Sequence, residues 1–450
     1  MNAGLVARYG QERLPRYTSY PTAPHFSNAV DPRTYAEWLR SIAPNSSASL
    51  YLHVPFCRSM CWYCGCHTTI SRRDQPIATY VAALHREIRL ISEQTSQPVV
   101  VNHIHFGGGT PTIMAPELFM GLVQALRQSF IVSSQAEIAV EIDPRTLTEE
   151  MIGALASAGV NRVSLGVQSF DPAVQQAINR LQSFEDTATV TEGLRRAGVS
   201  NINFDLIYGL PHQTMASCLD TVRRSIELRP NRLSVFGYAH VPTFKKHQRK
   251  IEQAWLPDSL ERHRQSVAIG DALKKAGYIQ VGLDHFALPE DSMVTSMMSG
   301  KLRRNFQGYT TDTGHVLLGF GASAIGYLEH GYVQNETGIH AYLERISSGN
   351  LATARGFTLS SDDKLRADII ERIMCDFSVD LAQICAWHGV LSDDVLKATH
   401  RLDDLIANGI ARLEGALLTV PETSRFLVRS VAAAFDAYLD QSMRIHSAAV

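Results

Sequence analysis

The sequence predicts an α/β protein: a partial (β/α)6 barrel with an N-terminal arm and a small, mostly helical C-terminal domain. Three observations support this fold class. From about residue 50 to 287, short runs rich in Val, Ile and Phe alternate with amphipathic helical patterns. Many of these runs are apolar on both faces, as in a parallel sheet covered by helices. After about residue 337 the pattern becomes mostly helical, and the 450 residues exceed the usual size of one compact core.

Six runs are interpreted as the barrel strands, and the helical patterns between them complete the β–α units. The strands are expected at 49–54, 103–106, 137–142, 162–167, 201–207 and 232–238, and the helices at 77–93, 116–129, 149–158, 184–197 and 216–228. Gly159 and Gly198 follow two of these helices, where glycine commonly ends a helix. Consecutive β–α units imply a parallel barrel or partial barrel, in which ligands bind at the carboxyl ends of the strands.

We expect the domains to divide at residues 1–35, 36–335 and 336–450. The first segment is predicted to be an ordered but irregular arm. In the last segment we expect helices at 362–377, 381–387, 393–408 and 425–443, and a hairpin or wing over ARLEGALLTV. This order would make the C-terminal domain winged-helix-like, but no basic run supports DNA binding.

The charge balance argues against two classes of partner. The chain has 42 basic and 44 acidic residues, whereas general attraction to nucleic acid or membranes needs a basic excess. No apolar signal-like segment opens the sequence, and the uncharged run 316–328 is too short to span a bilayer. We therefore expect a cytoplasmic protein without a nucleic-acid or membrane partner. We also expect a monomer, since nothing in the sequence indicates a coiled coil.

Four of the seven cysteines lie within ten positions, after the first expected strand. The segment HVPFCRSMCWYCGCHTTI spaces Cys57, Cys61, Cys64 and Cys66 as C-x3-C-x2-C-x-C. Structural zinc usually uses two separated pairs of ligands, and no second pair follows in the sequence. Three thiolates on one loop can instead hold three irons of a [4Fe–4S] cube and leave the fourth iron open. An iron–sulfur cluster is therefore favoured over zinc or unliganded thiols.

Cys66 could be the fourth ligand, although its spacing of one residue from Cys64 makes joint ligation of a cube awkward. The other cysteines are expected to be buried in helices, where a thiol packs as a small hydrophobic group. They are Cys218, Cys375 and Cys385.

The motif C-x3-C-x2-C, with an aromatic residue before its last cysteine, resembles the radical S-adenosylmethionine (SAM) superfamily. Further motifs narrow the resemblance: RYTSYPTA, GGGTPT, GVQSF, DLIYGLP, RLSVFGYAHVPT, DHFA, RNFQGYTT and GASAI. Together with Cys66, they are similar to the family of oxygen-independent coproporphyrinogen III oxidases (dehydrogenases) of haem biosynthesis. The likeness runs from about Arg16 to the C-terminal helix.

The resemblance implies one [4Fe–4S] cluster and two bound SAM molecules. Cys57, Cys61 and Cys64 would ligate the cluster, SAM would bind the open iron, and Cys66 would lie outside the cluster. Residues at positions implied in SAM binding are Tyr51, Tyr63, Gly108, Gly109, Thr110, Glu141, Gln168, Arg180, Asp205, Ala239 and Ile325. Candidates for binding the substrate or the second SAM are Arg16, Arg304, Phe306 and Gln307.

Considered from the residues alone, several of these positions have structural alternatives. Glu141 and Asp205 follow apolar strand segments and need a partner, which SAM, its ribose or Arg180 would supply, or which a structural salt bridge would supply instead. The glycines at 107–109 allow a ligand to approach the backbone, or they form a plain turn. His53 is expected to be a hydrogen-bonded structural histidine.

The resemblance also implies a reaction. A flavodoxin- or ferredoxin-type donor would reduce the cluster, and SAM would be cleaved to methionine and a 5′-deoxyadenosyl radical. This radical would take a hydrogen from the β-carbon of a propionate of coproporphyrinogen III, and loss of CO2 and one electron would leave a vinyl group. Repetition on a second propionate would give protoporphyrinogen IX. The alternatives are another porphyrin-handling radical SAM protein (a haem chaperone or a haem-degrading methyltransferase) and, outside the superfamily, a zinc-stabilised binding protein.

Overall fold

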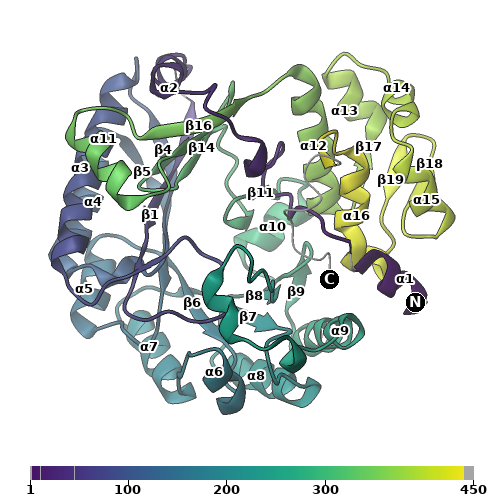
Figure 1. Ribbon diagram of the computed structural model, residues 1–450, viewed down its shortest axis with the longest axis horizontal. Coiled ribbons are helices and arrows are strands. Elements are labelled where there is room, and N and C mark those ends of the chain that lie inside the picture. Colours follow the sequence, from purple (N-terminus) through teal and green to yellow (C-terminus); the bar gives the residue numbers. More distant parts are fainter. Residues whose placement is uncertain (1–2, 11, 45, 440–450) are drawn as a thin grey trace.

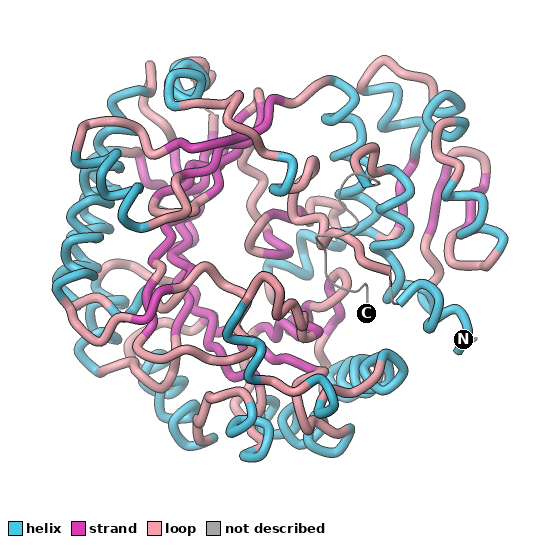
Figure 2. Tube along the Cα trace, in the orientation of Figure 1, coloured by secondary structure: helices cyan, strands magenta, loops and turns pink. Residues whose placement is uncertain are grey.

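A computed structural model of the chain describes residues 3–10, 12–44 and 46–439. Its centre is a curved sheet of twelve strands, and helices cover the outer side of this sheet (Figures 1 and 2). The strand order is β16-β15-β14-β13-β1-β4-β5-β6-β7-β8-β10-β9. Because the edge strands β16 and β9 do not pair with each other in this order, the barrel is partial.

The six strands that the sequence predicts are present, and they all run parallel. They are β1 (Ser47–Val54), β4 (Val100–Gly108), β5 (Ile131–Ile142), β6 (Arg162–Gln168), β7 (Asn201–Tyr208) and β8 (Arg232–Gly237). The five predicted helices are also confirmed: α3 (Gln75–Gln94), α4 (Pro116–Ser129), α5 (Glu149–Ser157), α7 (Phe184–Arg196) and α8 (Met215–Glu227).

Alternation of side chains along β1 shows how the sheet separates its core from its site. Leu50, Leu52 and Val54 belong to the main hydrophobic core under the outer helices. The residues between them point to the opposite face, because successive side chains of a strand alternate. These are Tyr51 and His53, whose side chains hydrogen-bond each other. The inner face of the barrel therefore carries polar groups.

Strands that the sequence did not predict extend the sheet on both sides. β13 (Val316–Phe320) pairs with β1 in parallel, and β14 (Ile325–Leu328), β15 (Gly331–Asn335) and β16 (Thr353–Thr358) continue antiparallel. On the other side, β10 (His285–Ala287) and β9 (Ile279–Val281) follow β8. Helix α11 (Ile339–Ser347) contacts α3.

The expected domain division at residue 336 therefore needs an amendment. Residues 339–358 include α11, whose Tyr342 and Ile346 belong to the main hydrophobic core, and β16, which pairs with β15 in the large sheet. A second hydrophobic core includes Leu365 and most later buried residues of the chain. We propose that the C-terminal domain begins near residue 360.

The C-terminal domain joins helices to a small sheet of order β17-β19-β18. Its elements are α12 (Ser361–Asp376), β17 (Ser378–Asp380), α13 (Leu381–Trp387), α14 (Ser392–Lys397), α15 (Arg401–Ala407), β18 (Arg412–Glu414) and β19 (Leu417–Thr419). The predicted hairpin is confirmed by the pairing of β18 with β19. The helix predicted at 393–408 is instead divided into α14 and α15.

The closing helix predicted at 425–443 is wrong within the described residues. The chain forms the 3-10 helix η5 (Glu422–Leu427), the short helix α16 (Val428–Ala432) and the 3-10 helix η6 (Ala433–Phe435). Extended backbone at Asp436 ends this run, and its carboxylate accepts from Tyr17 Oη and from the backbone N of Tyr438. Residues 440–443 of the predicted helix lie outside the described part of the chain.

The N-terminal arm connects the two cores. It contains α1 (Ala3–Gly10) and α2 (Pro32–Arg40), and Figure 1 shows α1 beside the C-terminal domain. Tyr9, Leu14 and Tyr17 belong to the core of the C-terminal domain. Further along the arm, Phe26 stacks on Tyr332 of β15 with ring centroids 5.5 Å apart. The arm thus packs against the C-terminal domain near its start and against the large sheet further along.

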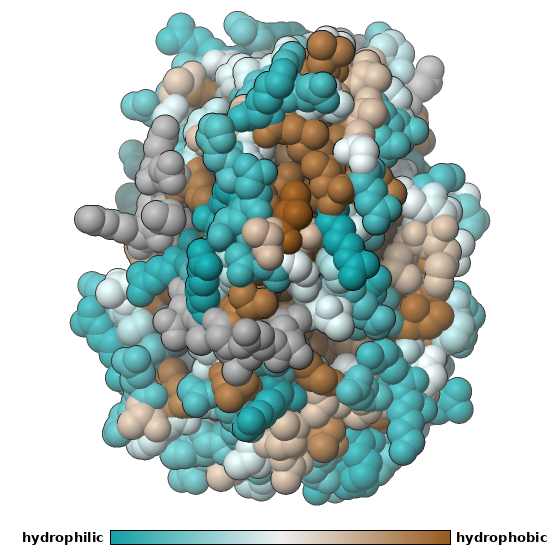
Figure 3. All heavy atoms as spheres, turned by 90° about the vertical axis from the view of Figure 1, so that its right-hand side faces the viewer, coloured by the Kyte–Doolittle hydropathy of each residue, from teal (hydrophilic) through white to brown (hydrophobic). Residues whose placement is uncertain are grey.

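The remaining elements border the site or the open side of the barrel. They are β2 (Phe56–Cys57), β3 (Thr69–Ile70), α6 (Pro172–Ala177), α9 (Ser259–Lys275), α10 (Ser292–Met298), β11 (Arg303–Asn305), β12 (Gly308–Thr310) and the 3-10 helices η1 (Ala23–His25), η2 (Pro111–Ile113), η3 (Lys246–Lys250) and η4 (Gln253–Trp255). Figure 3 shows polar and hydrophobic side chains mixed on the face at the right of Figure 1. None of the described helices is both long and apolar enough to cross a membrane.

Candidate functional site

The cysteine loop, residues 57–68, leaves the sheet at the carboxyl end of β1. Cys57 ends β2, and β2 pairs with β3 beyond the loop, so the two ends of the loop lie side by side. All four cysteines are free thiols; Cys61 is buried, Cys66 is exposed, and the other two are half-buried. Burial raises the pKa of Cys57 to about 11, and the nearby thiols of Cys64 and Cys61 also raise it. These three thiols are therefore close neighbours.

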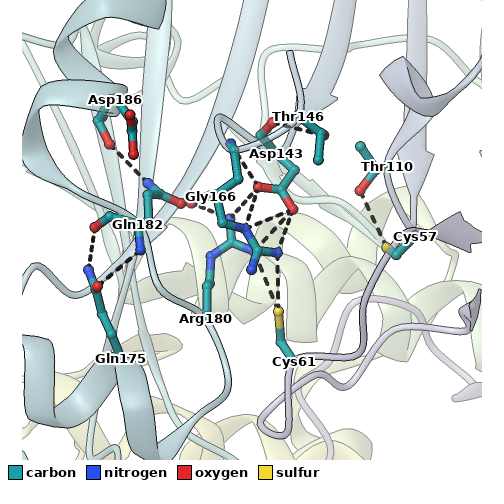
Figure 4. A network of polar contacts seen from close by, with 12 residues as sticks. Cys57, Cys61, Thr110, Asp143, Thr146, Gly166, Gln175, Arg180, Gln182 and Asp186 are labelled. Carbon is teal, nitrogen blue, oxygen red and sulfur yellow. Dashed lines mark hydrogen bonds and ion pairs between the residues drawn. The ribbon is translucent and has the colours of Figure 1, made fainter.

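Two guanidinium groups contact Cys61, and a carboxylate that binds both of them lies behind (Figure 4). Arg145 Nη2 and Arg180 Nη1 donate to Cys61 Sγ at 3.5 and 3.6 Å. Asp143 lies between the two arginines and accepts from Arg145 Nη2 at 2.6 Å and from Arg180 Nη2 at 3.3 Å. Burial favours the neutral acid, but hydrogen bonds and charge from Arg145 and Arg180 outweigh it and lower the pKa of Asp143. Cationic donors of this kind stabilise an anionic sulfur.

The backbone of the cysteine loop is anchored by side chains that follow β8. These side chains come from η3 and the residue before it, and each hydrogen-bonds a carbonyl oxygen of the loop. The contacts are Gln248 Nε2 to Tyr63 O at 3.0 Å, His247 Nε2 to Cys64 O at 2.7 Å and Lys245 Nζ to Cys66 O at 3.0 Å. The segment 245–248 therefore covers the loop and fixes its path.

The glycine run after β4 permits a close approach, and the approaching group is the protein's own backbone. A Cβ atom at Gly109 would lie 2.5 Å from the carbonyl oxygen of Phe56, in the strand that carries Cys57. The next residue, Thr110, places Oγ1 at 3.3 Å from Cys57 Sγ (Figure 4). Gly109 therefore has a role beyond the two that the sequence suggested, a plain turn or room for a ligand, because it packs against the backbone of Phe56. The glycine run positions the first cysteine.

Glu141 of β5 fixes the end of β4 from inside the barrel. It accepts from the backbone N of Gly108 at 3.0 Å and hydrogen-bonds His105 Nε2 at 3.2 Å. The ring of Tyr51 stacks on His105, with centroids 5.8 Å apart, and its hydroxyl hydrogen-bonds His53 Nδ1 at 3.0 Å. His53 also hydrogen-bonds a backbone oxygen of the cysteine loop, which accords with the structural role expected for it.

Of the alternative partners considered for Glu141 and Asp205, Arg180 is not the one that the structure shows. Arg180 follows α6, and its guanidinium reaches Asp143, one residue beyond the end of β5. Asp205 of β7 instead accepts from Ser164 Oγ and Asn203 Nδ2, both at 2.8 Å. These neutral donors offset burial only in part, so burial raises the pKa of Asp205 to about 6. A half-buried acid that forms no ion pair with any described residue thus lies on the inner face of the sheet.

The raised pKa of Asp205 predicts a pH-dependent stability. Its pKa is higher in the folded chain than the ordinary 3.8, so the folded state binds the proton more tightly. Stability from this group is present below about pH 4 and is lost as the pH rises towards 6, by roughly 3 kcal/mol in total. We expect Asp205→Asn to gain stability relative to the wild-type apoprotein between pH 4 and pH 7. Thermal unfolding at several pH values tests this, and parallel curves for the two proteins would contradict it.

Three further candidates lie at the same edge of the sheet. Gln168 ends β6 with a φ of 68°, which is uncommon for a residue with a side chain. Its buried Oε1 has no hydrogen-bond partner among the described residues, so it offers an acceptor to a ligand. Ala239 follows β8 by two residues, and Ile325 begins β14 beside the end of β13. Tyr63 packs in a hydrophobic cluster next to the cysteine loop.

The four candidates for substrate or second SAM lie towards the open side of the barrel. Arg304 and Phe306 line a pocket that is open to solvent. The carbonyl oxygen of Arg16 accepts a hydrogen bond from Arg304 Nη2 at 3.3 Å. The guanidinium of Arg16 donates to the carbonyl oxygen of Gly237 at 3.5 Å. Gln307 lines a separate, smaller pocket in the barrel interior. The structure therefore brings Arg16 and Arg304 together and leaves Gln307 apart from them.

The donor set of the cysteine loop fits a [4Fe–4S] cluster held by three thiolates. Among the described residues, no three His, Cys, Asp or Glu side chains converge closely enough to ligate one metal ion. A cube takes each thiolate on a different iron, so its ligands surround a space and do not meet at one point. The donors to Cys61 and the hydroxyl beside Cys57 suit anionic sulfur.

Sequence reasoning missed residues that support the loop. Asp143 and Arg145 stand in EIDPR and directly follow the strand expected at 137–142, so their charge at a strand end was a signal that could have identified them. Lys245, His247 and Gln248 bind backbone oxygens. No motif signals such contacts, because a carbonyl accepts from any donor of suitable reach.

Comparisons with known proteins identify the family to which the sequence and the fold of this chain are similar. Residues 51–224 match the family model described as the radical SAM superfamily. The chain is 64% identical, over the full length of both chains, to an oxygen-independent coproporphyrinogen III oxidase of Bradyrhizobium diazoefficiens. It is 39% identical to that of Pseudomonas aeruginosa, covering 97% of this chain and 96% of the relative. The solved coproporphyrinogen III oxidase of Escherichia coli, a radical SAM enzyme, superposes with a TM-score of 0.90 at 36% identity, covering 95% of this chain and 100% of that one.

Proposed function

The chain belongs to the family of oxygen-independent coproporphyrinogen III oxidases, within the radical SAM superfamily, and on this premise we propose that it converts coproporphyrinogen III to protoporphyrinogen IX. Two propionate side chains of the substrate lose CO2 oxidatively and become vinyl groups. The observation that carries the proposal is the set of three free thiols at the carboxyl edge of the parallel sheet, Cys57, Cys61 and Cys64. Another porphyrin-handling radical SAM protein is not favoured, because the relatives named above are coproporphyrinogen III oxidases.

Cys57, Cys61 and Cys64 are proposed to hold one [4Fe–4S] cluster. When bound and reduced, the cluster supplies the electron that cleaves SAM to methionine and a 5′-deoxyadenosyl radical. Arg145 and Arg180 donate to Cys61 Sγ and so disperse negative charge on the sulfur. Thr110, Tyr63 and the covering segment 245–248 keep the loop in one path.

The residues of the inner face are proposed to bind SAM and to orient it. The set is Tyr51, Tyr63, Gly108, Gly109, Thr110, Glu141, Gln168, Arg180, Asp205, Ala239 and Ile325. Glu141 and Asp205 present fixed carboxylates to hydroxyl or amine groups, and Gln168 presents its unpaired carbonyl oxygen. Arg16, Arg304, Phe306 and Gln307 are proposed to serve the substrate or a second SAM. No side chain acts as a nucleophile; the protein binds, orients and excludes water.

We propose further properties that follow from this activity. The electron donor is a flavodoxin- or ferredoxin-type protein, because the reaction needs a one-electron reductant of low potential. The enzyme works as a monomer in the cytoplasm. Size-exclusion chromatography with light scattering tests the monomer, and a mass of twice 49.7 kDa would contradict it.

Cys66→Ala is predicted to keep the iron of the cluster. Cys66 is exposed, and its thiol donates a hydrogen bond that lowers the pKa of Cys64 to about 6. The variant loses that hydrogen bond and no ligand, so we expect nearly full iron and sulfide content with slower SAM cleavage. Iron and sulfide analysis after anaerobic reconstitution measures this. Loss of the iron would instead show that Cys66 is a ligand.

The proposed function is tested by anaerobic turnover. The reconstituted protein is incubated with coproporphyrinogen III, SAM and a chemical reductant, and the porphyrin products are separated after oxidation in air. We expect a dicarboxylate product with two vinyl groups. SAM cleavage without any vinyl product would reject this function and favour a relative with another substrate.

A further inference from the structure

Four arginines from four separate elements meet beside the carboxyl ends of β7 and β8. This arginine cluster consists of Arg16 of the arm, Arg262 of α9, Arg304 of β11 and Arg429 of α16. Arg16 Nη2 donates to O of Gly237 at 3.5 Å, and Arg262 Nη2 donates to O of the next residue, Tyr238, at 2.8 Å. Arg304 Nη2 donates to O of Arg16 at 3.3 Å. Residues remote in sequence thus converge on one place.

The positive charges of the cluster act on one another. Burial lowers the pKa of Arg16, Arg262 and Arg429, in the last case to about 10. Neighbouring guanidinium groups lower these pKa values further: Arg304 acts on Arg16, Arg16 acts on Arg262, and both Arg16 and Arg304 act on Arg429. Like charges at this spacing repel, so their assembly costs free energy unless an anion joins them.

The carboxylate that the cluster contains is Asp284, whose charge acts on three of the four arginines. Asp284 is itself bonded to His285 Nδ1 at 2.8 Å. In the described part of the chain, no carboxylate oxygen lies within 4.0 Å of the guanidinium of exposed Arg16 or of half-buried Arg262 and Arg304, whereas fully buried arginines elsewhere form such ion pairs. Examples are Arg180 with Asp143 at 3.3 Å and Arg232 with Asp291 at 2.6 Å.

The cluster also has hydrogen-bond donors to spare. Arg304 Nε and Nη1 and Arg262 Nε are buried and have no hydrogen-bond partner among the described residues. A guanidinium carries five N–H donors and no acceptor, and buried charged donors without a partner are costly. Arg304 also lines the solvent-open pocket that contains Phe306, so a ligand in that pocket can reach the cluster.

The cluster adjoins the proposed SAM site. Gly237 and Tyr238, whose carbonyl oxygens hold Arg16 and Arg262, directly precede Ala239. A molecule bound to the cluster can therefore extend from it to the inner face of the barrel. Carboxylates suit the cluster, because guanidinium groups bind them with two parallel hydrogen bonds that fix both position and plane.

We propose that the arginine cluster binds propionate carboxylates of the tetrapyrrole substrate, and that Arg262 and Arg429 act in this with Arg16 and Arg304. The inference rests on the proposed function, which supplies the tetracarboxylate. Carboxylates held at the cluster anchor the macrocycle while another propionate lies at the SAM site. Substrates without free carboxylates are expected to bind poorly for this reason.

The test is anaerobic fluorescence titration of the full-length, reconstituted protein with two probes. Coproporphyrin III carries four carboxylates, and its tetramethyl ester carries none. We expect the wild-type protein to bind the tetracarboxylate more tightly than the ester. Arg262→Gln and Arg429→Gln should each weaken binding of coproporphyrin III by about 10-fold or more, and should leave binding of the ester unchanged. Arg196→Gln, at an exposed position of α7, is the matched control and should bind both probes as the wild type does.

Turnover separates this inference from the proposed function. If the wild-type protein forms no vinyl product, the function is wrong. If the wild type turns over, but both variants bind coproporphyrin III as the control does, the arginine cluster is not the site. Should a glutamine variant fail to fold, Arg262→Lys and Arg429→Lys keep the charge and lose the paired hydrogen bonds, and weaker binding is still expected from them. A raised KM for coproporphyrinogen III in the Arg262 and Arg429 variants, with an unchanged KM in the Arg196→Gln control, is the expected kinetic signature.

Discussion

Cys57→Ala, Cys61→Ala and Cys64→Ala are each expected to abolish SAM cleavage. The three thiols are neighbours on one loop at the carboxyl edge of the sheet, and a ligand set that acts as a unit fails when one member is lost. We expect rates of SAM cleavage to fall by roughly 10³-fold or more. Production of 5′-deoxyadenosine under reducing conditions measures the rate, and iron and sulfide analysis measures the cluster.

A matched control is available in the same chain. Cys218 is a buried thiol on α8, away from the loop. Cys218→Ala should keep both the cluster and SAM cleavage, because it removes a packed thiol and no ligand. Full iron content in any of the three loop variants would show that the ligand assignment is wrong.

Asp143→Asn is expected to destabilise the protein strongly. The side chains of Asp143, Arg145 and Arg180 are only 11%, 18% and 7% exposed, and the variant leaves both guanidinium groups without their carboxylate. Removing one partner of a buried ion pair costs roughly 3 kcal/mol or more. Chemical unfolding of the apoprotein, followed by circular dichroism, measures this change. Arg180 also donates to Cys61 Sγ, so we expect lower iron content as well.

The control for Asp143→Asn is a substitution of a surface aspartate that also has two arginine partners. Asp220 pairs with Arg223 and Arg224 along α8, and its side chain is 44% exposed. Exposed ion pairs contribute little, so Asp220→Asn should change stability by less than about 1 kcal/mol. Equal losses in Asp143→Asn and Asp220→Asn would contradict the structural role given to the buried network.

The parallel strands could be predicted from the sequence because each carries its own signal. A run such as 201–207 is apolar on both faces and is followed by a helical pattern, so neighbouring residues identify it. β16, with the sequence TARGFT, has no such pattern. It forms a strand because its backbone pairs with the edge of β15. The neighbouring residues in the sequence do not indicate that such a pairing partner is present.

The parts of the site that could be predicted are those whose chemistry follows directly from the type and spacing of the residues. Cysteine spacing indicates a cluster by itself, whereas Arg180 could be assigned a partner only from the fold. Its guanidinium reaches Asp143 because the loop after α6 passes over the end of β5. The partner thus depends on a loop path that spacing along the chain does not reveal.

We propose that a radical from SAM takes hydrogen from a propionate β-carbon of coproporphyrinogen III. Substrate that carries deuterium at these carbons tests it most directly, with mass analysis of the 5′-deoxyadenosine formed during one anaerobic incubation of the reconstituted protein. We expect deuterium in the 5′-deoxyadenosine, together with two vinyl groups in the porphyrin product. Unlabelled 5′-deoxyadenosine beside labelled, unconverted substrate would contradict the claim.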